Sequence, residues 1–292
     1  MGYLHIENLY KNQTILLFRE CYALEKVHGT SAHVAWQGGA GAADARLSFF
    51  SGGEKHDKFR ALFDDVALRT GFERLGHTEV TVFGEAYGGS CQGMKATYGD
   101  SLRFIVFDVR VGETWLAVND MAQVAEGLGL EVVPYSSASS DLATLDALRD
   151  ASSEVAVRRG CGEKPREGIV LRPLVEMILS NGSRVIAKHK GETFAETKTP
   201  RKVVDPAALV VLADAEAIAV EYVTEMRLSH VLDKLPEAKG LEQTGMVIKA
   251  MVEDVLREAA GEVVDSKAAR QAIGKRAAAL YKQRICKIEK ED

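Results

Sequence analysis

The pattern of the chain changes near Pro200 and Pro206. Before these prolines, short apolar runs rich in β-branched and aromatic residues alternate with glycine-rich turns, as strands do. After them, Ala, Leu, Glu and Lys recur at helical spacing, as in "MVIKAMVEDVLREAA". The change predicts an α+β protein with a mixed domain over residues 1–204 and a small all-helical domain over 205–292.

Within the first domain, residues 14–50 are expected to form strand, turn and strand. Apolar spacing predicts a helix that starts near Asp57 and ends near Gly71. The runs "EVTVFGEAYGG" and "RFIVFDVRVG" predict two further strands, and a helix over 119–129 would take Asn119 as its N-cap.

The later part of this domain contains a polar stretch, "SSASSD", that reads as a loop before a helix. The run "EGIVLRPLVEMILSNGSRVIAKHKG" then predicts a hairpin, because Asn181-Gly182 is a strong turn signal. No internal repeat is evident in the sequence.

Composition narrows the classes of protein. The 292 residues are 46% hydrophobic, enough for a large and a small core, and the formal net charge of −5 predicts no general attraction to nucleic acid. Four cysteines without C-x-x-C spacing argue against a zinc site or a disulfide framework. We expect a cytoplasmic monomer without membrane contact, because the sequence has no apolar run of about 20 residues and no signal-peptide pattern.

Local charge differs from the net charge between residues 267 and 290. Eight Lys or Arg fall there against one acid, Glu289. Such a run is often a solvated helix face, and the sharper hypothesis is contact with a polyanion. The residues expected to bind nucleic acid are Lys267, Arg270, Lys275, Arg276, Lys282 and Arg284.

Four stretches place charged residues against apolar strands, where a fold avoids leaving charges unpaired. They are "EKVHG" at 25–29, "FGE" at 83–85, "EGIV" at 167–170 and "AKHK" at 187–190. Each alone has an ordinary explanation, since a lysine in a turn is usually at the surface and lysines on one strand face often protect a sheet edge.

Taken in this order, the four stretches together with "FIVFDV" resemble the covalent nucleotidyltransferases, the superfamily of ATP-dependent polynucleotide ligases and capping enzymes. The similarity is greatest to the RNA ligase 2 type and covers about residues 5–200. It implies an ATP-grasp-like ligase adenylation domain of antiparallel sheets with flanking helices. The histidine of "HG" at His28, where DNA ligases commonly have an acid, is the main reason to favour RNA.

The resemblance implies a role for each motif residue. Lys26 would attack the ATP α-phosphate, a step that needs a neutral amine, and Lys188 and Lys190 would contact that phosphate. Within the same motif, His28 would take part in catalysis, and Val27 and Gly29 would border the nucleotide, with Gly29 allowing a close approach of the backbone.

Four further residues complete the nucleotide site that the resemblance implies. Glu25 would read the adenine edge, Glu85 would contact the ribose, and Phe107 would stack on the purine. Glu167 would hold Mg²⁺ or Mn²⁺, because such ions prefer oxygen ligands. On a regular strand, Phe107 and Asp108 would face opposite sides.

Some positions depart from the RNA ligase 2 pattern. Leu24 and Ser31 stand where the family tends to have Arg and Asn, and only Ser51-Gly52-Gly53 represents an arginine-bearing element. Lysine does not reproduce the bidentate phosphate contact of arginine. Arg46 and Lys55 are the two alternatives left for this role.

The implied reaction is RNA ligation through lysyl-AMP and an adenylylated 5'-phosphate end, attacked by a 3'-hydroxyl, and RNA repair is the implied setting. The alternatives are a DNA ligase or a capping guanylyltransferase, both of which usually carry a strand-rich OB-fold after the last lysine motif. A protein of another class, a non-catalytic nucleic-acid-binding protein with a ligase-like fold, is the remaining alternative.

Overall fold

The computed structural model describes residues 2–38, 45–199, 201, 203 and 211–291. It divides into two compact units, residues 1–191 and 192–292. The expected boundary at 204/205 lies outside the described residues. Each unit has its own hydrophobic core.

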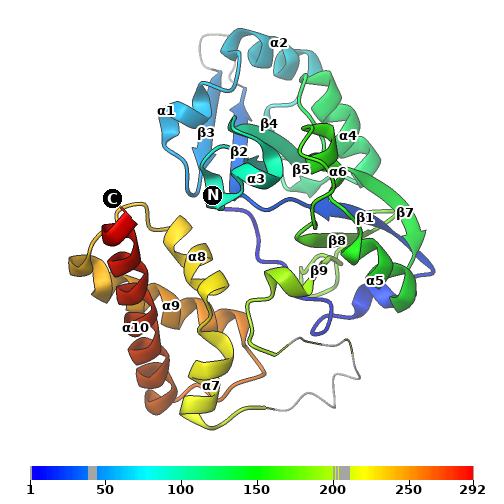
Figure 1. Ribbon diagram of the computed structural model, residues 1–292. Coiled ribbons are helices and arrows are strands. Elements are labelled where there is room, and N and C mark those ends of the chain that lie inside the picture. Colours follow the sequence, from blue (N-terminus) through cyan, green and yellow to red (C-terminus); the bar gives the residue numbers. More distant parts are fainter. Residues whose placement is uncertain (1, 39–44, 200, 202, 204–210, 292) are drawn as a thin grey trace. The chain divides into compact units, whose positions relative to one another are not determined.

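Unit 1 contains two antiparallel sheets (Figure 1). The four-stranded sheet A has the order β7-β1-β8-β9, and the five-stranded sheet B has the order β3-β2-β4-β5-β6. The strands are β1 (Glu20–Lys26), β2 (Thr30–Gln37), β3 (Arg46–Ser51), β4 (Glu79–Tyr87), β5 (Arg103–Val111), β6 (Thr114–Trp115), β7 (Tyr135–Ser139), β8 (Gly168–Pro173) and β9 (Ala187–Lys190). The predicted α+β class is confirmed.

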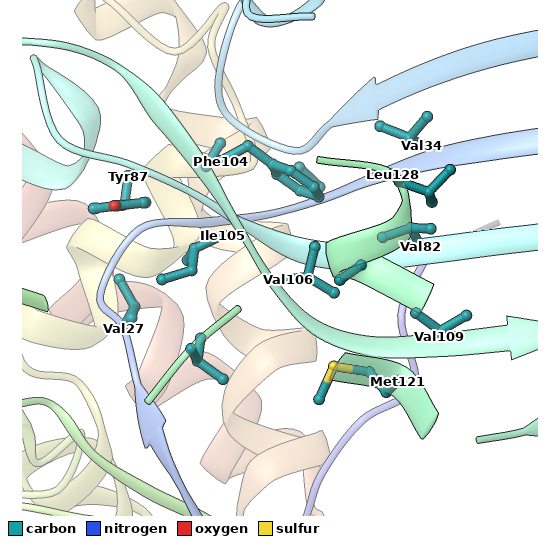
Figure 2. Close-up of a cluster of buried hydrophobic side chains, with 14 of the residues drawn as sticks. Val27, Val34, Val82, Tyr87, Phe104, Ile105, Val106, Val109, Met121 and Leu128 are labelled. Atoms are coloured by element: carbon teal, nitrogen blue, oxygen red, sulfur yellow. The ribbon is translucent and has the colours of Figure 1, made fainter. Parts of the chain in front are cut away.

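Short helices accompany these sheets. They are α1 (His56–Arg60), α2 (Asp65–Leu75), α3 (Lys95–Tyr98), α4 (Val118–Gly127), α5 (Leu142–Asp150) and α6 (Glu154–Arg158), with 3₁₀ turns at Thr14–Leu17 and Cys91–Gly93. The core of unit 1 gathers side chains from sheet B and α4, including Val82, Val106 and Met121 (Figure 2).

The predicted helix near Asp57 is broken into α1 and α2, because the Asp64 carboxylate accepts hydrogen bonds from the N–H groups of Val66 and Ala67 and starts a new helix. Gly71 does not end α2. A Cβ there would meet Leu128 Cδ2 at 2.8 Å, so the glycine permits close packing, and the helix ends at Leu75 with Gly76 as its C-cap at φ +72°.

Three other predictions about local structure were wrong. Residues 14–17 form a 3₁₀ turn instead of a strand, and α4 follows Ala117, with the Asn119 amide donating to the Tyr22 hydroxyl. Most of the polar stretch "SSASSD", at 136–141, belongs to the edge strand β7, whose side chains are largely exposed and so carry no apolar pattern. The hairpin was right, since β8 and β9 pair antiparallel and Gly182 adopts φ +81°.

Unit 2 is helical in its described residues, as the spacing predicts. Its helices are α7 (Ala215–Tyr222), α8 (Glu225–Asp233), α9 (Thr244–Glu258) and α10 (Lys267–Glu291), with 3₁₀ turns at Glu192–Phe194 and Leu241–Gln243. Val247, Met251 and Val255 are fully buried in its core. Arg227 is also buried and donates to Asp254 at 2.7 Å.

Candidate functional site

The end of sheet A brings two of the motif lysines into one row. Lys26 of β1 lies opposite Gly168 of β8, and Gly168 lies opposite Lys190 of β9. Gly168 has φ +151°, and a Cβ there would fall 2.2 Å from the His189 carbonyl oxygen. Only glycine fits this close approach of β8 and β9.

Glu167, immediately before β8, contacts both lysines of this row. Its carboxylate lies 2.9 Å from Lys26 Nζ, 3.0 Å from Lys190 Nζ and 3.3 Å from His28 Nδ1. Glu167 is 1% exposed, whereas the side chain of Lys26 is 24% exposed. The structure therefore joins four motif residues, from three separate stretches of sequence, around one buried carboxylate.

The ionisation of Glu167 is set by two opposed causes. Burial alone would raise the pKa of this carboxyl, but Lys26, Lys190 and His28 outweigh burial and hold the pKa well below its usual range. The carboxylate is therefore charged at neutral pH. A charged carboxylate is the form that a hard divalent cation or a lysine ammonium requires.

The turn after Lys26 is fastened to β4 and α3. Glu85 Oε1 accepts a hydrogen bond from the Gly29 N–H at 3.1 Å, and the Tyr98 hydroxyl accepts one from the His28 N–H at 3.3 Å. A Cβ on Gly29 would lie 2.2 Å from the Ala86 carbonyl oxygen. The glycine is thus explained by the approach of the turn to β4, a contact within the fold.

Glu25 is turned away from this group, because successive strand residues face opposite sides of a sheet. Its carboxylate accepts hydrogen bonds from the Ser153 hydroxyl and from the Glu154 N–H at 2.9 Å, at the start of α6. Burial raises its pKa, while Ser153 and Arg166 act in the opposite direction. Reading of the adenine edge by Glu25 stays a prediction.

Phe107 lies on sheet B at an irregularity of β5. Phe83 pairs with Asp108 and Gly84 with Val106, so Phe107 is the extra residue of a β-bulge. The bulge breaks the alternation expected for residues 107 and 108. Phe107 is half-buried, and the Tyr3 ring packs against it at 4.9 Å between centroids.

Lys188 is on the same strand face as Lys190 and is buried. Its backbone N–H donates to the Glu7 carbonyl, and its carbonyl accepts from the Leu9 N–H, so the N-terminal segment pairs with β9. Between the two lysines, His189 Nε2 lies 2.7 Å from Asp146 Oδ1 of α5. Neither Tyr3 nor Ser153 was singled out from the sequence, because neither lies in a motif.

The structure also places Val27, which was expected to border the nucleotide, and the positions that depart from the RNA ligase 2 pattern. Val27 and the departing residue Leu24 are both buried in the core of unit 1, and Figure 2 labels Val27 there. Ser31 pairs with Glu85, at the end of sheet B near the motif turn. Arg46 lies at the opposite end of β3, whereas Lys55 follows the end that bears Ser51, and the role of either as a substitute cation stays a prediction.

A cavity of about 550 Å³ lies in unit 1, lined by Phe83, Trp115, Arg110 and Arg184 and by N-terminal residues. In the register of β4 and β5, Phe83 lies opposite Asp108 and Arg110 lies opposite Thr81, and the two residues of each pair share one face of the sheet.

The basic residues of α10 in unit 2 are mostly at the surface. Exposed are Lys267, Arg270, Lys275, Arg276 and Lys282, whereas Arg284 is half-buried and donates to Ser229.

Comparison with known proteins places the chain in a family. The RNA ligase family model matches residues 19–190, more than half of the chain, and the chain belongs to this family. Similar solved structures include three mutants of a Naegleria gruberi RNA ligase, one with ATP and Mn, one with AMP and Mn, and one apo form.

These three structures are distant matches. Each has a TM-score of 0.50, with 15% identity for the first two and 16% for the third. Each match covers 66% of this chain and 57% of the Naegleria chain, so this chain spans little more than half of those proteins. Among the described residues, no helix is both long and apolar enough to cross a membrane.

Proposed function

We propose that the chain is an ATP-dependent RNA ligase that seals 5'-phosphate and 3'-hydroxyl ends. Family membership supports the general activity, and the carboxylate shared by Lys26, Lys190 and His28 carries the detailed proposal. A lysine at a strand end, 24% exposed and beside buried charges, can reach a bound nucleotide while the fold holds its position.

In the first step, Lys26 Nζ attacks the α-phosphorus of ATP. A P–N bond forms, the P–O bond to pyrophosphate breaks, and the neutral amine gives one proton to solvent, so that the nitrogen of lysyl-AMP keeps one hydrogen. The 5'-phosphate of RNA then displaces the lysine and takes the AMP, and a 3'-hydroxyl attacks that phosphate and releases AMP. Lys188 and Lys190 suit the charge on the phosphates, because these displacements depend on alignment and charge neutralisation.

Before the attack, Lys26 must be deprotonated and released from Glu167. The 2.9 Å contact with Glu167 engages the same Nζ atom that has to reach phosphorus. Lys190 also contacts this carboxylate, so Glu167 keeps a cationic partner when the Lys26 amine turns to phosphorus. We assign to His28 and Glu167 the positioning of Lys26.

A divalent cation fits the same carboxylate. Glu167 is charged and offers hard oxygen ligands, and Mg²⁺ needs few protein carboxylates when phosphates and waters complete its shell. Mg²⁺ or Mn²⁺ would neutralise negative charge on the nucleotide. The Naegleria structures with ATP or AMP and Mn support this choice of nucleotide and metal.

Labelling with radioactive ATP tests whether Lys26 accepts AMP. Wild-type protein incubated with α-³²P-ATP and Mg²⁺ should retain acid-stable label. The labelling rate of Lys26→Ala should be lower by roughly a thousandfold or more, as expected when a nucleophile is removed. Lys11→Ala, an unrelated lysine change, should label normally. Equal labelling of wild type and Lys26→Ala would refute the proposal.

We further propose that unit 2 grips the RNA. Lys267, Lys275 and Lys282 are seven or eight residues apart and exposed, so they lie along one face of α10. Replacing all three by Gln should weaken RNA binding and lower the salt slope by about two to three, from roughly 0.7 to 0.9 per phosphate contact. Self-adenylylation should remain unchanged. An equal loss of both activities would indicate a folding role.

The rival functions differ in testable ways. The helical secondary structure described for unit 2 disfavours a DNA ligase or capping enzyme, whose following domain is usually strand-rich. Comparing nicked RNA with nicked DNA, and ATP with GTP, separates these enzymes. A non-catalytic binding protein would bind RNA without accepting label.

A further inference from the structure

The pairing of β4 with β5 does not fix the orientation of the Phe107 ring. As the extra residue of the bulge, it has no cross-strand register partner to fix its direction. A purine gains from stacking only when the receiving ring is held in one orientation. If Phe107 stacks on the base, as the proposed function requires, another side chain has to fix its ring.

Tyr3 makes such a contact. Its ring meets Phe107 at 4.9 Å and 72° between planes, an edge-to-face geometry that occupies at most one of the two faces of Phe107. Tyr3 also packs against Phe83 at 5.1 Å and Trp115 at 5.7 Å. At least one face of Phe107 thus remains outside this contact.

The hydroxyl of Tyr3 fixes its own ring in turn. It donates to Asp108 Oδ2 at 2.7 Å, and Asp108 is the residue after Phe107. Asp108 is fully buried and accepts from Arg172 at 3.1 Å and Arg184 at 2.6 Å. The Tyr3 ring is therefore anchored to the same backbone bulge that carries Phe107.

The segment that carries Tyr3 is also hydrogen-bonded to β9. Glu7 and Leu9 exchange backbone hydrogen bonds with Lys188, at 2.9 and 2.8 Å. One short stretch of chain thus contacts Phe107 of sheet B and Lys188 of sheet A, two of the residues assigned to the nucleotide.

We propose that Tyr3 is a positioning residue for nucleotide binding, which holds the Phe107 ring in the orientation that stacks on the purine of ATP. This inference rests on the proposed ligase function. It assigns to the N-terminal segment a role in ATP affinity, distinct from the chemical step at Lys26.

The test is the steady-state rate of RNA sealing against ATP concentration at saturating RNA ends, because self-adenylylation alone is a single turnover. Tyr3→Leu should raise the KM for ATP about tenfold and leave kcat within about twofold, because a base contact is weakened while the reacting groups stay in place. Tyr3→Phe keeps the ring and loses the hydroxyl's bonds to Asp108 and Arg184, so its KM should rise about two- to threefold. Tyr135→Leu, a change of an edge-strand tyrosine, is the matched control with unchanged KM.

A double-mutant cycle then asks whether Tyr3 acts through Phe107. In a Phe107→Leu background, Tyr3→Leu should change the KM by less than about twofold. A full tenfold effect there, or an unchanged KM in Tyr3→Leu, would overturn the inference. Thermal melting checks folding, and if Tyr3→Leu is unfolded, an unchanged KM in Tyr3→Phe refutes the inference. Failure of wild type to take label would instead refute the ligase proposal.

Discussion

Glu25 near the end of β1 and Glu167 just before the neighbouring strand β8 are both buried glutamates, yet their surroundings are opposite. Glu167 meets two lysines and a histidine, and the pKa of its carboxyl lies well below the usual range. Glu25 meets neutral donors, the Ser153 hydroxyl and a backbone N–H, and burial raises its pKa.

The difference distinguishes a glutamate of the candidate site, Glu167, from a glutamate that stabilises the fold, Glu25. In the proposed function, Lys26 exchanges its contact with Glu167 for the α-phosphate, and Glu167 exchanges a lysine contact for a metal ion. A hydroxyl and a backbone N–H at the start of α6 are fixed parts of the fold, and they tie α6 to the strand that ends in Lys26. Two adjacent motif residues, Glu25 and Lys26, thus serve opposite faces of sheet A.

Within the comparison of the two glutamates, the largest expected effect comes from Glu167→Gln. The amide removes the charge that positions Lys26 and suits a cation, so self-adenylylation should fall by roughly a hundredfold or more. Glu163→Gln, an exposed change four residues earlier, should have no effect. The labelling rate at saturating ATP measures this, and wild-type activity in Glu167→Gln would remove Glu167 from the site.

A smaller effect is expected for Glu25→Gln. The amide oxygen can keep one of the two hydrogen bonds, so the free energy of unfolding should fall by about 1 kcal/mol and labelling by less than about tenfold. Urea unfolding and ATP titration measure these quantities. A rise in the KM for ATP of about a hundredfold without loss of stability would break the comparison and place Glu25 against the adenine.

The smallest effects are the opposite pH dependences of stability. The folded pKa of Glu167 is lowered, so its stabilisation relative to Glu167→Gln is present above the unfolded value of about 4.3 and is lost as pH falls through the folded pKa. The folded pKa of Glu25 is raised, so wild type loses stability relative to Glu25→Gln as pH rises from about 4.3 through the folded pKa. Urea midpoints between pH 3 and 7 should diverge in these two directions, and parallel curves would contradict the assignment.

Sequence patterns predicted the strands and helices in which apolar side chains recur at a regular spacing. The apolar strands β4, β5 and β8 and the amphipathic helix α9 carry their structure in side-chain spacing. The edge strand β7 and the break between α1 and α2 were missed, because solvent removes the apolar signal from one and a single capping aspartate causes the other.

The site was predictable only through ordered motifs. Lys26, Glu167 and Lys190 are far apart in sequence, and their meeting depends on strand register, which spacing does not encode. The bulge at Phe107 and the contact of Tyr3 with Phe107 were not predicted for the same reason, since both depend on how β5 aligns with its neighbours.

Gly168 has a consequence for how this chain can vary. It contributes no reactive atom, yet every other residue would drive a Cβ into the backbone of β9 between His189 and Lys190. Neighbouring positions in the same strand can exchange one aliphatic residue for another. In a saturation library, therefore, position 168 should be as intolerant as position 26, and a residue without a side chain would appear as essential as the proposed nucleophile.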